Sequence, residues 1–335
     1  MPSARLVYVL SPAKTLDLTA SRVSQCSQPS LLPDAHELID QLRSLSQAKV
    51  KSLLGVSDAL AKLNYDRFQA FDESEAATKA SKPMETLKQA VLAFNGPAYQ
   101  GLGAHNLLDV ELDYAQSHLR ILCGLYGALR PLDLIQPYRL EMGQKFANSR
   151  GKDLYEFWGD SIVSELDKLF SESEANDDEK KQRVLVNVAS QEYFKSLPRD
   201  ALKNARISVV DCVFKDDGKI KSVYAKRARG LMCRYLIQKR VDSLEGITKF
   251  ELEGYKYSSS ASSDDTFVFT RTAAAQKAAL AETQVKAKAL SKASPKTKRA
   301  VDKTNKSENK THAQEEDDSE NPAVRRSTRK KRKTE

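Results

Sequence analysis

The apolar positions of the chain predict five β-strands. The first run, Leu6 to Leu10, is rich in β-branched and aromatic residues and ends at a Ser-Pro pair, which is typical of a buried strand. Asp217 and Gly218 suit a tight turn, so the runs on either side of them are predicted to pair as a hairpin. The five predicted strands cover residues 6–10, 183–190, 205–214, 218–226 and 266–271.

Helical spacing fills the intervals between these strands. In the segment 33–45, Leu38, Leu42 and Leu45 follow one another at spacings of four and three, which places them on one face of a helix. Further helices are predicted over 84–94, 112–124, 153–170 and 225–240. A mixed β-sheet surrounded by helices belongs to the α+β class, and we expect a single folded domain over residues 1–270.

The net charge of the chain is concentrated in its last segment. Residues 271–335 contain 18 Lys and Arg against 9 Asp and Glu, whereas the 270 residues before them contain 36 of each. The same segment has no Phe, Tyr or Trp, so it buries too little apolar surface to offset the entropy of ordering. We therefore predict that the basic tail over 271–335 is disordered, or helical only transiently.

Membrane, metal and cofactor sites are not predicted. No apolar run approaches the roughly 18 residues that a membrane-spanning helix needs, and the first residues lack the pattern of a secretory signal. The four Cys and four His are scattered, without the close spacing of a zinc or redox motif. We expect a soluble intracellular protein without a bound metal or cofactor.

The loop after the first predicted strand offers two kinds of chemistry. Ser11 and Lys14 could form a nucleophile pair, with Lys14 accepting the proton of Ser11. The same loop could hold a phosphate, although the Gly-x-x-x-x-Gly-Lys pattern of a nucleotide-binding loop is absent. Ser190 and Lys195 repeat the arrangement after another strand, as if both loops met at one edge of the sheet. A third interpretation is structural, with Ser11 capping a turn and Lys14 exposed.

The segment 118–143 contains a glycine pair, Gly124 and Gly127, between predicted helical residues. Such a turn can present backbone N–H groups to a phosphate, which is how a helix-hairpin-helix element grips DNA. The alternative is a helix C-cap followed by a turn in the core. A looser hairpin pattern covers 53–68. Arginines that would add positive charge to the first hairpin are Arg120, Arg130 and Arg139.

The predicted helix 225–240 carries several basic residues. Lys226, Arg229 and Arg234 fall near one of its faces, while apolar residues can turn inward. A basic stripe on an otherwise neutral body suits contacts with phosphates. The alternative is an ordinary solvated helix face.

Six of these stretches, taken together and in order, resemble the YaaA peroxide-stress family. The resemblance covers roughly residues 5–271 and implies one α and β domain with a helix-hairpin-helix element and a cytosolic location. It also implies protection against hydrogen peroxide and binding of double-stranded DNA in a positively charged cleft, without an established reaction. The matching blocks are 10–17, 118–143, 150–160, 186–196, 224–237 and 253–257.

The tail departs from the bacterial members of that family. Its Ala/Lys-rich part resembles the arms of linker histones, and residues 325–333 hold seven basic residues in nine. Such a cluster, from Arg325 to Lys333, suits a nuclear-import receptor or a second contact with DNA phosphates. The compartment predicted from the tail is therefore the nucleus, whereas the family resemblance implies the cytoplasm.

Two functions follow from these observations. The main prediction is a DNA-binding protein of the response to hydrogen peroxide, which contacts the phosphate backbone. The alternative is an enzyme acting on a nucleotide or nucleic acid, with Ser11, Lys14, Glu141 and Asp153 as candidate catalytic residues. The predicted DNA contacts are Lys14, Arg120, Gly124, Gly127, Arg130, Arg139, Lys195, Lys226, Arg229 and Arg234.

Overall fold

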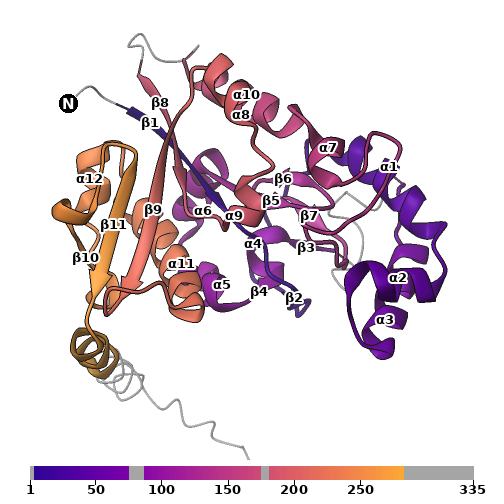
Figure 1. Cartoon of the computed structure of the whole chain (residues 1–335), viewed down its shortest axis with the longest axis horizontal. Coiled ribbons are helices and arrows are strands. Elements are labelled where there is room, and N and C mark those ends of the chain that lie inside the picture. Colours follow the sequence, from indigo (N-terminus) through magenta and orange to yellow (C-terminus); the bar gives the residue numbers. More distant parts are fainter. Residues whose placement is uncertain (1–3, 75–86, 175–180, 283–335) are drawn as a thin grey trace, which may run out of the picture. The chain divides into compact units, whose positions relative to one another are not determined.

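A seven-stranded mixed sheet forms the centre of the protein in the computed structural model, which describes residues 4–74, 87–174 and 181–282 (Figure 1). The strand order is β10-β11-β9-β8-β1-β5-β6, parallel in the middle and antiparallel at both edges. This confirms the predicted α+β class with a mixed sheet. The strands are β1 (Ala4–Leu10), β5 (Leu119–Cys123), β6 (Gly127–Leu129), β8 (Gln182–Asn187), β9 (Ser208–Asp216), β10 (Lys256–Tyr257) and β11 (Thr266–Arg271).

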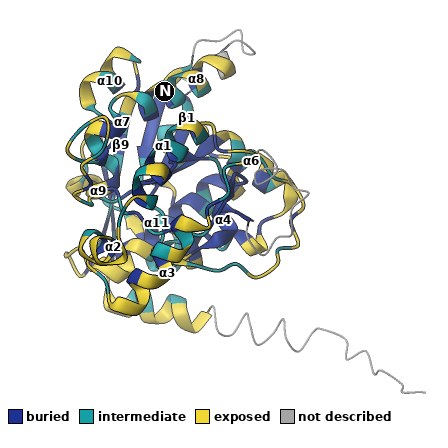
Figure 2. Ribbon diagram, turned by 90° about the vertical axis from the view of Figure 1, so that its right-hand side faces the viewer, coloured by how far each residue is buried: buried dark blue, intermediate teal, exposed yellow. Residues whose placement is uncertain are grey.

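Strand β1 lies inside the sheet, and both of its edges are paired with neighbouring strands. Tyr8 lies opposite Leu119 of β5 on one side and opposite Val186 of β8 on the other. A strand with parallel neighbours and covered faces reads as a continuous apolar run, which explains the composition of residues 6–10. Figure 2 shows the central strand in the buried colour, while α2 and α3 carry most of their residues at the surface.

Helices and short two-stranded ribbons surround this sheet. Strand β2 (Thr15–Leu16) pairs with β4 (Phe94–Asn95), and β3 (Lys88–Gln89) pairs with β7 (Leu134–Ile135). A further helix covers residues 273–282. The α-helices are α1 (Leu32–Arg43), α2 (Gln47–Leu54), α3 (Asp58–Gln69), α4 (Ala90–Ala93), α5 (Pro97–Leu102), α6 (Asp109–His118), α7 (Leu154–Trp158), α8 (Ser161–Glu174), α9 (Gln191–Phe194), α10 (Arg199–Asn204), α11 (Ser222–Lys239) and α12 (Leu244–Thr248).

The strand predicted over 218–226 is wrong. The turn itself forms, since Asp217 and Gly218 both have positive φ and Asp216 bridges to Lys219. The chain then enters α11, because β9 already pairs with β8 on one edge and with β11 on the other. A strand after the turn would have no edge to join.

The helix predicted over 84–94 is also largely wrong, in the residues that the structure describes. From residue 87 onward the chain forms β3, one turn of α4 and β4. The amides of Ala90 and Val91 donate to the carbonyl oxygens of Asp133 and Pro131, so the distant loop 131–133 holds this segment and only one helical turn forms within it.

Arg271 is the last residue of β11 and belongs to the folded body. Its side chain is 2% exposed and forms an ion pair with Asp216 at 2.5 Å, and Tyr255 donates to the same carboxylate at 2.8 Å. The predicted strand 266–271 includes this residue correctly, whereas its place in the predicted tail 271–335 is wrong. The tail beyond residue 282 lies outside the described residues, and its predicted disorder stays a prediction.

Candidate functional site

A pocket of about 330 Å³ lies at the carboxyl ends of β1 and β8. At β1 the order of the sheet reverses, with β5 on one side and β8 on the other. Open α/β sheets bind ligands at such points, just outside the strand ends. The walls come from residues 10–15 after β1, 95–99 at the start of α5, 138–141, the residues that follow β8, and α11.

Two serines join the loops that follow β1 and β8. The backbone amide of Ser190 donates to Ser11 Oγ at 2.8 Å, and Ser11 Oγ donates to Ser190 Oγ at 3.3 Å. Tyr99 Oη donates to the Ser11 carbonyl oxygen at 3.1 Å and ties α5 to the same point. The expectation that the two loops meet at one edge of the sheet is confirmed. The hydroxyl of Ser11 thus bonds to Ser190, and its role here is to hold the two loops together.

Glu141 pairs with two cations of the pocket. Lys14 Nζ lies 2.6 Å from Glu141 Oε2, and Arg139 Nη2 lies 3.1 Å from Glu141 Oε1. The Lys14 side chain is 63% exposed, whereas that of Glu141 is only 14% exposed, so the lysine lies at the mouth and the carboxylate lies deeper. Three of the residues predicted from sequence therefore meet in one cluster.

Helix α11 contributes two further cations. Lys226 is exposed and Arg229 is half-buried, and both line the pocket. Burial lowers the pKa of Arg229 below its ordinary value. Within the described parts of the chain, neither residue forms an ion pair with a carboxylate. The pocket therefore has two cations available to an anionic ligand.

Glycines allow α11 to approach the pocket this closely. A Cβ on Gly230 would lie 1.7 Å from the Ala98 carbonyl oxygen, and a Cβ on Gly101 would lie 2.2 Å from that of Arg227. The backbones of α5 and α11 are therefore almost in contact where they cross. This crossing fixes Lys226 and Arg229 against the wall that residues 95–99 form.

Several pocket residues were not predicted from sequence. Tyr99, Tyr138 and Tyr193 line the interior and are at least nine-tenths buried. The Gly96-Pro97 pair is typical of a turn before a helix, and it was the one local indication of the segment 95–99 that forms this wall. Tyrosines carry no sequence signal that separates a ligand wall from ordinary core.

Gly124 and Gly127 lie in the turn of a β-hairpin, so the predicted helix-hairpin-helix over 118–143 is wrong. The helix predicted over 112–124 ends at His118, and the next residues pair with β1 as strand β5. A Cβ on Gly124 would lie 2.4 Å from the Leu140 carbonyl oxygen, and one on Gly127 would lie 2.8 Å from the Trp158 ring. Both glycines are buried and serve packing, as the core-turn alternative expected.

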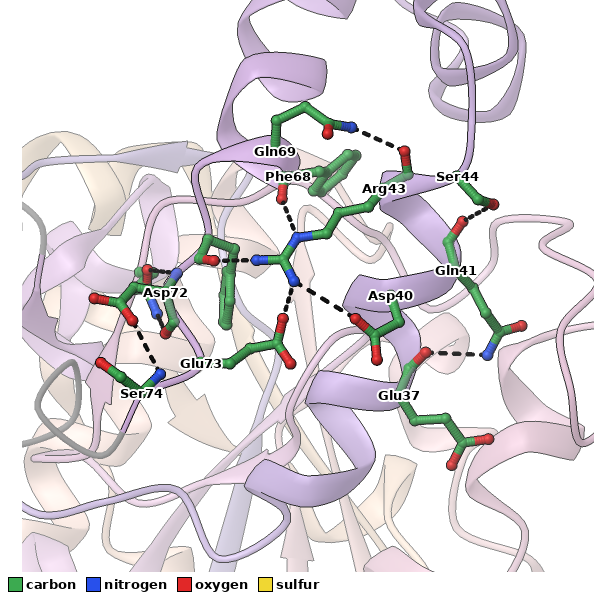
Figure 3. A network of polar contacts seen from close by, with 12 residues as sticks. Glu37, Asp40, Gln41, Arg43, Ser44, Phe68, Gln69, Asp72, Glu73 and Ser74 are labelled. Atoms are coloured by element: carbon green, nitrogen blue, oxygen red, sulfur yellow. Dashed lines mark hydrogen bonds and ion pairs between the residues drawn. The ribbon is translucent and has the colours of Figure 1, made fainter.

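The weaker hairpin pattern, over 53–68, does contain two helices. Helix α2 ends at Gly55, whose φ of 61° is left-handed, and the Ser57 side chain caps α3. Arg43 of α1 holds the end of α3 by donating to the Phe68 carbonyl oxygen at 3.0 Å (Figure 3). Neither α2 nor α3 contributes a residue to the lining of the pocket.

Two of the predicted arginines serve structure rather than the pocket. Arg120 is 9% exposed and donates to the carbonyl oxygens of two neighbouring residues, and burial lowers its pKa to about 10. Arg130 pairs with Asp133 at 3.0 Å, where the fully buried carboxylate needs a counter-charge. Neither residue lines the pocket.

Three other predicted residues also lie outside the pocket lining. Asp153 caps α7 by accepting a hydrogen bond from the amide of Glu156. Lys195 Nζ lies 4.5 Å from the centre of the Tyr155 ring. Arg234 is half-buried further along α11, and burial lowers its pKa. None of the three lines the pocket, and the predicted DNA contacts of Lys195 and Arg234 stay predictions.

The fold and pocket define an α+β protein with a cationic site at the carboxyl edge of its sheet. A sequence profile of the peroxide stress protein YaaA matches residues 6–261. The UPF0246 proteins of Burkholderia mallei (strain SAVP1) and Burkholderia pseudomallei (strain 1106a) are each 51% identical to this chain over 275 residues, which is 81% of this chain and all of each relative. The protein therefore belongs to the YaaA family of peroxide stress proteins, as the resemblance predicted.

Membrane spans and metal clusters are both absent from the residues that the structure describes. No helix in those residues is both long enough and apolar enough to cross a bilayer. No group of three or more His, Cys, Asp or Glu is arranged there to hold a metal ion.

Proposed function

We propose that this protein binds duplex DNA through the phosphate backbone as part of the response to hydrogen peroxide. The observation that carries the proposal is the pair of cations on α11. Lys226 and Arg229 line the pocket and have no carboxylate partner in the described chain, so an external anion would complete the site. Phosphates are the anions that DNA offers, and the family's association with peroxide stress makes DNA a fitting partner.

The charge of the pocket supports this proposal. Residues 1–270 are neutral overall, yet the lining holds four Lys and Arg against two Glu. Local excess charge of this kind draws a polyanion to one place on a neutral body. Since contacts of this type carry no base information, the binding is proposed to be independent of sequence.

The basic tail is proposed to be a second, linked contact. Residues 325–333 carry seven positive charges and lie outside the described residues. Two linked sites bind with higher avidity than either alone, because the second contact forms at high effective concentration. The same cluster is proposed to bind a nuclear-import receptor, which an import assay with fluorescent full-length protein would test.

Salt-dependent binding tests the role of the pocket. Full-length protein, with residues 325–333 changed to Ser and Gly so that the tail does not mask the body, is titrated onto a labelled duplex at several salt concentrations. Lys226→Ala should weaken binding and reduce the slope of log K against log salt by about 0.9, the value of one phosphate contact. Lys239→Ala, at the other end of the same helix, is the matched control and should change neither. Equal slopes for all three proteins would contradict the proposal.

A second candidate function is an enzyme on a nucleotide or nucleic-acid substrate. The observation that favours it is the 2.6 Å contact between Lys14 and the shielded carboxylate of Glu141 inside a pocket. Glu141→Gln keeps the shape of the side chain and removes its charge. A product from end-labelled DNA or from free nucleotides that wild-type protein makes and Glu141→Gln does not, with DNA binding retained, would support this function. Absence of any product with the wild type would count against it.

A further inference from the structure

The pocket is too narrow for a DNA duplex. Its volume of about 330 Å³ is that of a site for one small molecule, far less than a segment of duplex occupies. A duplex can therefore touch the mouth of the pocket but cannot enter it. The volume lies at the lower end of the range for small-molecule sites, so the interior suits one small unit.

The cations of the pocket differ in depth. Lys14 and Lys226 are exposed and lie at the mouth, where a duplex backbone can reach them. The Arg139 side chain is 19% exposed and is paired with Glu141. Arg229 is half-buried and has no carboxylate partner among the described residues. An anion inside the pocket would therefore pair with Arg229, whereas one outside would pair with the lysines.

Three tyrosines, Tyr99, Tyr138 and Tyr193, line the interior beside aliphatic residues. The hydroxyl of Tyr99 donates to the Ser11 carbonyl oxygen, and Tyr138 Oη lies 2.7 Å from Cys123 Sγ. Because these hydroxyls are bonded within the protein, the rings offer mainly carbon to the pocket. Flat aromatic walls beside a cation are the features with which proteins hold single nucleotide bases.

From this arrangement we propose that the pocket holds one nucleoside phosphate unit, an unpaired nucleotide of the bound DNA, with its phosphate on Arg229 and its base beside the tyrosines. This inference rests on the proposed DNA binding, and it adds that a nucleotide leaves the stack when the protein binds. Lys14 and Lys226 hold the flanking phosphates at the mouth. The function of the enclosed volume is thus to select DNA in which a nucleotide is free to enter.

Fluorescence of 2-aminopurine tests the inference. 2-Aminopurine is placed in a mismatched pair of a duplex, where stacking quenches its fluorescence. Full-length protein is then added to saturation. Fluorescence should rise several-fold as the base is unstacked, while binding is followed separately by the anisotropy of an end label. Binding without a change of 2-aminopurine signal would overturn this inference and leave DNA binding intact. No binding at all would remove the proposed function first.

Two variants distinguish the interior from the mouth. Thr15 is exposed and lines the pocket, so Thr15→Trp places an indole at the entrance without changing the charge. We expect it to abolish the 2-aminopurine response and to leave anisotropy binding nearly unchanged. Arg229→Ala should also abolish the response and, because it removes a phosphate contact, should weaken binding measured by anisotropy, and Arg229→Lys should restore part of both. A full response from Thr15→Trp, with an unchanged melting temperature, would refute the interior site.

Free nucleotides show which source supplies the ligand. Wild-type protein and Thr15→Trp are titrated calorimetrically with thymidine 5′-monophosphate. If the natural ligand is a nucleotide within DNA, free thymidine 5′-monophosphate should bind at least tenfold more weakly than the mismatched duplex, and Thr15→Trp should abolish that binding. Tight binding of the free monophosphate, with a silent 2-aminopurine signal, would identify a free nucleotide as the ligand and overturn the proposed DNA source.

Discussion

Gly230→Ala probes the closest contact that positions the pocket. The added Cβ would lie 1.7 Å from the Ala98 carbonyl oxygen, 2.6 Å from its carbon and 2.7 Å from the amide nitrogen of Leu102. All three atoms belong to the backbone of α5, so no side chain can rotate away. To reach an ordinary contact of 3.4 Å or more, the two helices must part by at least 1.7 Å.

The expected loss of stability follows from two opposing effects. Overpacking of a filled core costs about 1 to 3 kcal/mol, and the rigid backbone here places this variant at the upper end. Alanine in a helix gains about 1 kcal/mol over glycine. We therefore expect a net decrease of about 2 kcal/mol in the free energy of unfolding, or a melting temperature lower by about 4 to 8 °C.

Urea unfolding followed by circular dichroism measures this change. Gln238→Ala, at an exposed position of the same helix, is the control and should stay within about 0.5 kcal/mol of wild type. The shifted helix should also lower the 2-aminopurine response, because Arg229 is adjacent to the substitution. If Gly230→Ala were as stable as wild type or more so, helix propensity would dominate and the argument from the close crossing would fail.

Two further predictions concern buried charge. Arg271→Ala leaves Asp216 buried without its 2.5 Å partner and should cost about 3 to 5 kcal/mol in urea unfolding, whereas Asp216→Asn combined with it should recover part of the loss. Burial lowers the pKa of His118 to about 4, and Arg5 donates to its Nε2 at 2.6 Å, so the ring is neutral in the folded state. Between these pKa values the unfolded state binds more protons than the folded state. The free energy of unfolding should therefore keep the full contribution of neutral His118 above about pH 6.5 and fall by up to about 3 kcal/mol as the pH drops toward 4. His118→Gln should flatten that profile, and an unchanged profile would contradict the assignment.

Local sequence pattern predicted correctly the elements that distant strand pairing does not change. The apolar run of β1 and the leucine spacing of α1 need no distant information, and both formed as predicted. Residues 119–123 continue a helical pattern but became β5, because the free edge of β1 offered a ladder of backbone hydrogen bonds. The run after Gly218 had the opposite fate, since no edge of β9 was left. Edge availability is a property of the assembled sheet and is absent from any window of sequence.

The site shows the same division between local and distant information. Lys14 was identified from its place after a strand, and its partner Glu141 was among the candidate carboxylates, but nothing in the sequence links positions so far apart. Arg120 and Arg130 carry the charge that a phosphate site needs, but neither lines the pocket. Arg120 is buried, and Arg130 pairs with the buried carboxylate of Asp133. Residue type predicted which groups could bind phosphate, and the tertiary fold determined which of them share a pocket.

The central place of β1 has a consequence for synthesis. This strand is synthesised before its partners, which lie near residues 119–121 and 182–187. At about 5 to 20 residues per second, β8 follows β1 only after roughly 10 to 35 s. Its apolar run stays without its final partners during that time, and contacts of such long sequence separation fold slowly. The Ser11 and Ser190 contact cannot form earlier either, so the pocket is completed only after β8 has left the ribosome, and slowing translation before that point should prolong the dependence of this protein on chaperones.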